Sequence, residues 1–524
     1  NITKGLYYDG NDYYYVLEQG VFATDYLLNL HGNKYYFGDD GKMVKDEIVE
    51  FEDEKYYCDP NGTMIKDTWL THQEIDDDGT IESVTYYFGP AGRAYRAVNR
   101  SNNMVIKNID GMKYGFNEYG ARLEGYVTRD GESVDVQEEE AIDQILYYFD
   151  PEEDYATASG WILYNGVKPE ELDDGEEMYF YFDEKTGRKL SARMPGTYYA
   201  REIEGERYLF DYYGIRQKKW HQVATTSIPR YYSEDYEGFL TKGWFEAVPK
   251  EDSIEEKNRQ YFKDNEEQWY YAATDGKIVR NTIKKIGIYF YCFDKDGVMQ
   301  SDCLVAVDGN TYIASYKIDE VTRNQVVLCK DEGGILEDGQ KWMYFMEPDE
   351  ETKVGAMCPL NKNLLLELGD EDVTFIANSH GGYGYELASD PAERNGKYYQ
   401  NGVLIKPLED CKYGIVRRHK LSVDSAVNYK VVGKSGNRIT KPGALKDENG
   451  NFILVGEDGT YLGTYAFSKC RLSIVNSNRS WVIEDQGGNQ IVCPENDLAS
   501  LADRMFTSKK LCLNFVEYPT FNTP

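Results

Sequence analysis

A repeat of 21 residues near the start of the chain constrains its fold more than any other feature. Three Tyr pairs, three Gly and three Asp recur at this interval: Tyr14-Tyr15, Tyr35-Tyr36 and Tyr56-Tyr57; Gly20, Gly41 and Gly62; Asp25, Asp46 and Asp67. One unit contains an aromatic strand over residues 34–37, turn residues over 38–41 and a return strand over 42–45, which is the pattern of a β-hairpin. An isolated hairpin is only marginally stable in water, so each unit must bury its aromatic face against its neighbours. The repeat therefore predicts an all-β, elongated β-solenoid of stacked hairpins.

Later copies of the aromatic strand follow at longer and less regular intervals, with mostly acidic and polar residues between them. These copies lie at residues 86–88, 147–149, 179–182, 208–210, 269–271, 289–291 and 398–399. A second register of 23 residues, with aliphatic strands, relates residues 429–439 to residues 452–462. We therefore expect a hairpin array over residues 1–302, degenerate repeats or an intermediate β-region over 303–409, and a β-rich C-terminal domain or cap over 410–524. A short helix is predicted over 495–506, with Asn496 as its N-cap.

The composition fits this architecture and excludes several classes of partner. The chain has 47 Tyr against 21 Phe and 7 Trp, and Tyr suits thin structures whose core lies near water because its ring is flat and its edge is polar. The 58 basic and 91 acidic residues give a net charge of −33, which repels nucleic acid and anionic lipid. No stretch of about 18 apolar residues is present, so membrane insertion is not expected.

The residues that carry chemistry form no recognisable catalytic or metal-binding pattern. The five His are scattered, and no HExxH, GxSxG or P-loop motif occurs. The nine Cys include no CxxC pair and fit buried free thiols better than a zinc site. The glycine-rich stretch 379–382 around His380 is interpreted as a turn, and the acidic runs 76–78 and 138–140 as solvated loops. We therefore expect no enzyme activity, no metal and no cofactor.

The repeat units resemble those of a known family. Gly-x-Lys-Tyr-Tyr-Phe, an Asp-Gly or Asn-Gly turn and Met-Val/Ile-Lys are similar to the cell-wall-binding repeats of choline-binding modules, glucan-binding proteins and clostridial toxins. The Gly-Trp opening of these repeats is present at Gly160-Trp161 and Gly243-Trp244, and their Trp-Tyr-Tyr strand at residues 269–271. Most units carry Tyr where choline-binding repeats carry Trp. The resemblance implies a β-solenoid with aromatic pockets between hairpins, attached outside a Gram-positive cell.

A carbohydrate or choline ligand needs flat aromatic faces, because sugars lay C–H bonds on them and quaternary ammonium is held by cation–π attraction. The candidate ligand-binding residues are Trp69 with Tyr56 and Tyr57, Trp161, Trp244, and Trp269 with Tyr270. The alternative role of every one of these rings is to pack one hairpin on the next.

The functional hypothesis is a non-catalytic extracellular binding protein or adhesin, displayed on the cell surface or secreted. Its partner would be a glycan, a cell-wall polymer or a host surface protein. Two alternatives stay open at this point: a targeting region of a larger secreted enzyme or toxin, and a structural component of a surface or secreted assembly.

Overall fold

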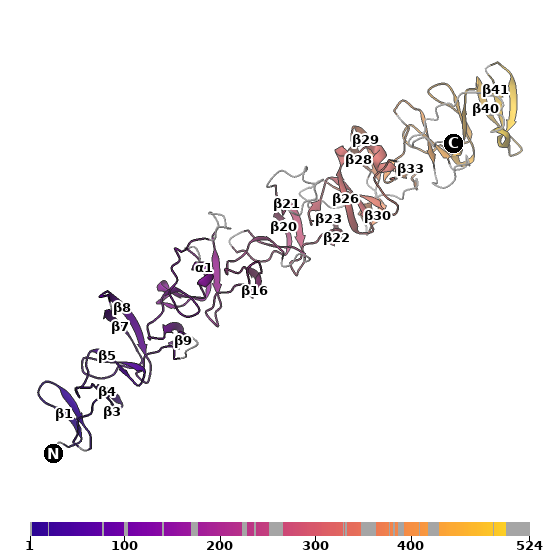
Figure 1. Cartoon of the computed structure of the whole chain (residues 1–524). Coiled ribbons are helices and arrows are strands. Elements are labelled where there is room, and N and C mark those ends of the chain that lie inside the picture. The colour runs from indigo at the N-terminus through magenta and orange to yellow at the C-terminus, as the bar shows by residue number, and fades with distance from the viewer. Residues whose placement is uncertain are drawn as a thin grey trace. The chain divides into compact units, whose positions relative to one another are not determined.

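The computed structural model describes most of the chain and is almost entirely β-structure (Figure 1). The described residues are 3–18, 20–75, 78–98, 103–138, 141–168, 177–222, 228–234, 237–250, 266–328, 330, 333–346, 363–376, 378–380, 383–385, 392–407, 409–417, 429–485 and 487–498. Within these ranges the α-helices are short: α1 spans Ala141–Gln144 and α3 spans Arg323–Val327. This confirms the predicted all-β class.

The chain divides into two compact units, residues 1–240 and 241–524. The first unit consists of antiparallel hairpins formed by strands that are consecutive in sequence, with one three-stranded sheet, β11-β12-β13. Its strands are β1 Gly5–Tyr8, β2 Tyr13–Val16, β3 Tyr26–Leu30, β4 Asn33–Phe37, β5 Glu47–Phe51, β6 Glu54–Cys58, β7 Thr68–Ile75, β8 Ile81–Phe88, β9 Met104–Ile109, β10 Met112–Asn117, β11 Gly125–Val127, β12 Tyr147–Asp150, β13 Ala156–Thr157, β14 Gly160–Leu163, β15 Tyr179–Phe182, β16 Tyr199–Ile203, β17 Glu206–Phe210, β18 Lys219–His221 and β19 Arg230–Tyr232.

The second unit begins with two similar hairpins, β20-β21 and β22-β23, and continues into larger sheets. Its strands are β20 Gly243–Ala247, β21 Gln268–Ala272, β22 Thr282–Ile286, β23 Tyr289–Phe293, β24 Met299–Gln300, β25 Cys303–Asp308, β26 Thr311–Lys317, β27 Lys341–Phe345, β28 Asn363–Leu368, β29 Glu371–Ile376, β30 Asn378–His380, β31 Tyr383–Tyr385, β32 Ala392–Arg394, β33 Lys397–Gln400, β34 Val403–Leu404, β35 Tyr413–Arg417, β36 Tyr429–Gly433, β37 Gly443–Lys446, β38 Phe452–Val455, β39 Tyr461–Tyr465, β40 Lys469–Val475, β41 Asn478–Glu484 and β42 Gln490–Pro494. The domain boundaries predicted at residues 302 and 409 stay predictions.

Backbone hydrogen bonds join each hairpin of the repeat to the one before it. After β4 the chain turns at Gly41, and two residues of the return segment then bond in opposite directions. Val44 N–H donates to the carbonyl of Tyr36 in its own hairpin, and Met43 N–H donates to the carbonyl of Tyr13 in the previous one. The same bond to the previous hairpin recurs further along the first unit, from Met64 to Lys34, from Ala94 to Lys55 and from Arg122 to Thr85. The hairpins are therefore stacked as predicted, since each return segment lies between two successive hairpins.

In the N-terminal repeats the core is divided into small, Tyr-rich clusters that draw on neighbouring hairpins. One of them joins Tyr36 of β4 with Val49, Tyr56 and Cys58 of the next hairpin and with Met64 of its return segment. Each cluster is only one hairpin deep, so Tyr suits these positions because its hydroxyl reaches a polar partner at the edge.

Two of the three repeated Asp residues accept hydrogen bonds from Tyr hydroxyls. Asp25 and Asp46 precede a first strand and adopt a left-handed backbone, with φ of 46° and 52°. The Tyr36 hydroxyl donates to the Asp25 carboxylate at 2.7 Å, and the Tyr57 hydroxyl donates to Asp46 at 2.5 Å. Asp tolerates the left-handed region better than most residues do. A single Asp therefore adopts the backbone conformation of the turn and also accepts the hydrogen bond from the Tyr hydroxyl.

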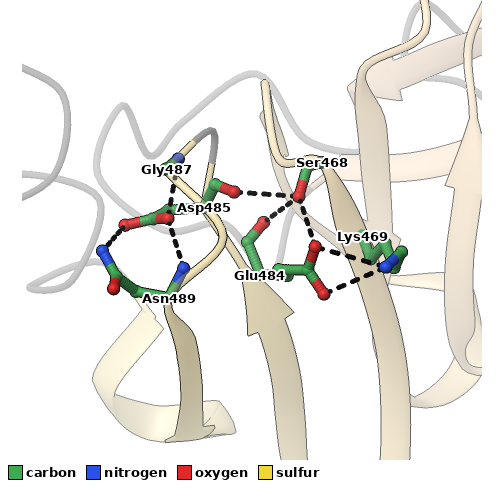
Figure 2. Close-up of polar contacts among 6 residues, drawn as sticks. All are labelled: Ser468, Lys469, Glu484, Asp485, Gly487 and Asn489. Carbon is green, nitrogen blue, oxygen red and sulfur yellow. Dashed lines mark hydrogen bonds and ion pairs between the residues drawn. The ribbon is translucent and has the colours of Figure 1, made fainter.

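Side-chain hydrogen bonds fix the turn between β41 and β42 near the end of the described residues. The Asp485 carboxylate accepts hydrogen bonds from the backbone N–H groups of Gly487 and Asn489 and from the Asn489 amide, while the Ser468 hydroxyl and Lys469 approach Glu484 (Figure 2). A 3₁₀ turn, Glu495–Asp497, begins where the helix was predicted. Residues 499–506 of that predicted helix lie outside the described residues.

Candidate functional site

Three aromatic clusters between successive hairpins share one construction. In each, a Trp on the first strand of a hairpin lies opposite a Tyr on the second strand, and a Tyr and a Phe two residues apart come from the second strand of the next hairpin. The Trp69 cluster contains Tyr87, Tyr114 and Phe116; the Trp161 cluster contains Tyr181, Tyr208 and Phe210; the Trp244 cluster contains Tyr271, Tyr291 and Phe293.

The distances within the three clusters are nearly the same. The Trp ring centroid lies 5.0, 5.0 and 5.2 Å from the Tyr of its own hairpin in the Trp69, Trp161 and Trp244 clusters, respectively. It lies 4.8, 4.7 and 4.7 Å from the Tyr of the next hairpin, and 5.9, 5.8 and 5.8 Å from the Phe. Each Trp is only partly buried. The geometry therefore presents an aromatic wall at the junction of two hairpins.

The local sequence explains why the Trp takes this position in two of the clusters. Gly160 and Gly243 precede Trp161 and Trp244 directly and have φ of 87° and 80°. This is a region that Gly enters without steric penalty. The following strand pairs with its partner in a fixed register, which sets Trp161 opposite Tyr181 and Trp244 opposite Tyr271.

The other predicted site residues take different places. Trp269 joins the Trp244 cluster, with 6.2 Å between the two indole centroids, whereas Tyr270 is 1 % exposed and its ring stacks on Phe245. Tyr56 and Tyr57 are 3 % and 8 % exposed. They belong to two clusters nearer the N-terminus, so the structure does not bring Trp69 together with them.

The sequence analysis did not identify Trp220, which also lies on the first strand of a hairpin, opposite a Tyr. Trp220 lies opposite Tyr231 at the start of a hairpin, with 5.0 Å between the ring centroids. The residue before it is Lys219, with φ of 65°, in the place that Gly occupies before Trp161 and Trp244. Because no glycine precedes Trp220, the Gly-Trp motif does not mark it in the sequence.

A basic side chain lies against two of these clusters, and a third basic side chain lies against Phe180 of a neighbouring one. The guanidinium carbon of Arg122 lies 5.6 Å from the Trp69 ring centroid, and that of Arg216 lies 5.2 Å from the Trp161 centroid. Lys189 Nζ lies 4.6 Å from the Phe180 centroid and donates to the carbonyl oxygens of Ile142 and Tyr213. The two arginine distances are within the range of cation–π attraction.

Burial controls the charge state of the groups around the clusters. Burial raises the pKa of Tyr114, Tyr181 and Tyr208 above the usual value of a phenol, so these rings are neutral at physiological pH. Burial also lowers the pKa of Lys189 to about 7, against the opposing effects of Asp211 and Asp143. Burial raises the pKa of the Asp211 carboxyl to about 6.

The Lys189 shift predicts a pH-dependent stability. Between about pH 7 and pH 10.5 the folded state holds Lys189 neutral while the unfolded state holds it protonated, so raising the pH favours folding in this window. The wild-type unfolding free energy should therefore rise with pH relative to Lys189→Met, by up to about 1.4 kcal/mol per pH unit. Urea unfolding at pH 7, 8 and 9 measures the difference. Parallel pH profiles of the unfolding free energy for the two proteins would contradict this prediction. The titration of Asp211, with its pKa of about 6, falls below the window between pH 7 and pH 10.5.

Among the residues that the structure describes, no group of three or more His, Cys, Asp and Glu is placed to hold a metal ion. His380 ends β30, whereas Gly381, Gly382 and parts of the acidic runs 76–78 and 138–140 lie outside the described residues. The six described Cys are free thiols, five of them buried; Cys329, Cys358 and Cys512 fall outside. The described helices include none long and apolar enough to cross a bilayer.

Comparison with known proteins identifies the repeat type. Residues 27–69 match the choline-binding repeat model, and residues 260–278 match the putative cell wall binding repeat model. The chain therefore carries repeats of the cell-wall-binding type, as the residues predicted, and such repeats are binding modules. A comparison with curated protein sequences found no match.

Several solved structures resemble the chain at low identity. Choline binding protein F from Streptococcus pneumoniae is 16 % identical, with a TM-score of 0.32 over 60 % of this chain and 100 % of that one. The modular autolysin LytC from the same species, in complex with a synthetic peptidoglycan ligand, is 15 % identical, with a TM-score of 0.30 over 58 % of this chain and 54 % of its own. An alternansucrase in complex with isomaltononaose is 18 % identical, with a TM-score of 0.19 over 58 % and 19 %. Similarity at this level carries no functional argument.

Proposed function

We propose that this chain is a non-catalytic, extracellular binding module of a Gram-positive bacterium. It recognises a cell-wall polymer or glycan through the aromatic walls between its hairpins. The observation that carries the proposal is the threefold recurrence of one cluster geometry around Trp69, Trp161 and Trp244. The first matched repeat ends at Trp69 and the second contains Trp269.

The chemistry of these walls suits an uncharged sugar face or a quaternary ammonium group. Indole and phenol rings attract both through their π-faces, and Tyr114, Tyr181 and Tyr208 stay neutral because burial raises their pKa. The net charge of −33 attracts cations at long range and repels anionic polymers that lack a cationic group.

The proposed binding function does not depend on whether the module stands alone or forms part of a larger protein. A free-standing surface protein and the targeting region of a larger secreted enzyme or toxin would both use these walls to hold a cell-wall polymer. A purely structural role would use the rings for packing alone, and it predicts no binding to such a polymer.

Cosedimentation of the full chain with purified Gram-positive cell wall tests the proposal. We expect saturable binding that free choline or soluble cell-wall fragments compete away. Binding should change little between 0.1 and 1 M NaCl, since contact with neutral rings is not screened by salt. Cellulose particles serve as the control polymer. Absence of cell-wall binding, or release by salt alone, would contradict the proposal and favour the structural role.

A further inference from the structure

We propose that a cavity in the first unit binds an amino sugar, with the primary ammonium group of the sugar held by carboxylates of the cavity wall. The cavity has a volume of about 470 Å³ and lies within residues 1–240. Three parts of the chain line it: the tip of hairpin β9-β10, the segment from Asp150 to Ile162, and the turn after β15. Among the described residues that line it there is no aromatic side chain. This site therefore differs in chemistry from the three Trp clusters and goes beyond the proposed function.

Hydrogen bonds between the walls hold the cavity open in the absence of a ligand. Lys113 at the tip of β9-β10 donates from Nζ to the carbonyl oxygens of Glu184 and Lys185 in the turn after β15, at 3.1 and 2.6 Å. The Thr157 hydroxyl of β13 donates to the carbonyl oxygen of Lys113 at 3.0 Å. These bonds join all three parts of the lining, so binding does not have to form the cavity first, which lowers its cost.

The turn after β15 is fixed in shape and approaches β13 closely. The Asp183 carboxylate accepts hydrogen bonds from the backbone N–H groups of Lys185 and Thr186, at 3.1 and 2.9 Å. Gly187 ends the turn with φ of 70°, and a Cβ there would lie 2.4 Å from the Thr157 Cγ2 atom. The backbone that carries Glu184 is therefore held in one place at the edge of the cavity.

The charges in the lining favour a cation. The carboxylates of Asp150, Glu153 and Glu184 line the cavity with a single basic group, Lys113. The Lys113 ammonium already donates to two carbonyl oxygens. Within the described residues, the Glu153 and Glu184 side chains have neither a hydrogen-bond nor an ion-pair partner. Two carboxylates are therefore available to a ligand, and the net charge of −33 attracts cations from a distance.

A primary ammonium group fits this lining better than a quaternary one. A primary ammonium has three N–H donors, and its hydrogen bonds to carboxylates are about twice as strong as those between neutral groups. A quaternary ammonium has no donor and depends on aromatic faces, which the described lining lacks. An anionic ligand would be repelled by the three carboxylates.

The remaining walls suit the body of a sugar. Ser159 adds an exposed hydroxyl, while Met112, Ala156 and Ala158 add apolar surface. A sugar ring presents both hydroxyl groups and C–H bonds, so it uses both kinds of wall, whereas a lysine side chain has only an aliphatic stem behind its ammonium. The volume of about 470 Å³ falls within the range of about 300–1,000 Å³ that is typical of small-molecule sites.

Calorimetric titration of the full chain at pH 6, where an amino group is protonated, tests the inference. Glucosamine should bind saturably. N-acetylglucosamine, which lacks the charge, and n-butylamine, which lacks the hydroxyls, should each bind at least about tenfold more weakly. Excess choline should not displace glucosamine, because the aromatic walls lie elsewhere. Equal binding of N-acetylglucosamine would overturn the role of the ammonium, and equal binding of n-butylamine would overturn the assignment to a sugar.

The variant Glu153→Gln/Glu184→Gln locates the binding in the cavity. Both side chains are exposed, so the variant should fold, and it should weaken glucosamine binding at least about tenfold. Glu132→Gln/Glu202→Gln is the matched control, since it neutralises two exposed carboxylates of the same unit that do not line the cavity, and it should change the affinity less than about twofold.

Ser159→Arg gives a second, independent test, because it places a guanidinium group in the cavity and should abolish glucosamine binding. Unchanged glucosamine affinity in a folded Glu153→Gln/Glu184→Gln or Ser159→Arg protein would overturn the inference. Failure of the proposed function looks different. The wild type would then not sediment with cell wall, while it still bound glucosamine in a manner that depends on Glu153 and Glu184.

Discussion

Replacement of Tyr36 by Ala is expected to lower the free energy of unfolding by about 3–5 kcal/mol, in a region confined to the neighbouring hairpins. Tyr36 is 8 % exposed and packs against Val49 and Met64 of the next unit, with its ring 5.9 Å from that of Phe51. The substitution therefore opens a cavity between two hairpins and also removes the hydroxyl that donates to Asp25. Urea unfolding gives the size of the effect, and hydrogen exchange followed by mass spectrometry gives its location.

Two control variants separate the contributions to this effect. Tyr36→Phe keeps the ring and loses only the hydroxyl, so it should lower the free energy of unfolding by about 1 kcal/mol. Tyr8→Ala removes the same type of side chain from a site where it is 52 % exposed. This variant should change the free energy of unfolding by less than about 0.5 kcal/mol. Equal loss of exchange protection throughout the first unit after Tyr36→Ala would show a single cooperative core and contradict the nearest-neighbour account.

The stacked hairpins could be predicted from sequence because the repeat contains its own turn chemistry. Gly41 and Gly62 follow their aromatic strands at a constant offset and both adopt positive φ, at 78° and 84°. A Cβ at Gly62 would collide with the Met43 thioether of the previous unit, so Gly is required there for packing as well as for the turn. Residues 303–396 carry no such regular signal, and the five-stranded sheet β28-β29-β34-β33-β32 is closed by the pairing of β29 with β34, which are not consecutive in sequence.

The Trp residues of the candidate site were predictable where a repeat motif marks them, although Trp69 follows Thr68 and Trp269 follows Gln268. Gly160 and Gly243 identified Trp161 and Trp244, whereas Lys219 concealed Trp220. The combination of Trp69 with Tyr56 and Tyr57 failed for a geometric reason. Adjacent residues of a strand point to opposite faces, so Tyr56 and Tyr57 enter two different clusters, and the rings around Trp69 come from its own hairpin and the next.

Sequence analysis did not identify the arginines, because their contact with the Trp rings depends only on their position in the repeat. Arg122 and Arg216 stand six residues after a Phe, where Met43 and Met299 stand in other units. A single basic residue in a return strand is ordinary surface chemistry until the structure shows its guanidinium between two rings.

Simultaneous replacement of Trp161, Trp244 and Trp269 by Ala is expected to lower the affinity for purified cell wall at least tenfold, equivalent to about 1.4 kcal/mol. The three rings belong to two of the clusters, and the removal of Trp244 and Trp269 takes both indoles from one wall. Each site should be weak by itself, and attachment at several sites on one polymer should strengthen it. Cosedimentation at increasing concentrations of cell wall, with circular dichroism to confirm folding, measures the effect.

The single variants divide this loss between the clusters. Trp244→Ala should account for most of it, and Trp161→Ala for little, because Arg216 already lies over the Trp161 ring at 5.2 Å. Tyr119→Ala is the control, since it removes a ring that is 67 % exposed and belongs to none of the three clusters. A folded triple variant that binds as tightly as the wild type would show that these indoles serve packing alone. The binding surface would then have to be sought among the acidic loops, where high salt should release the polymer because it screens the charges.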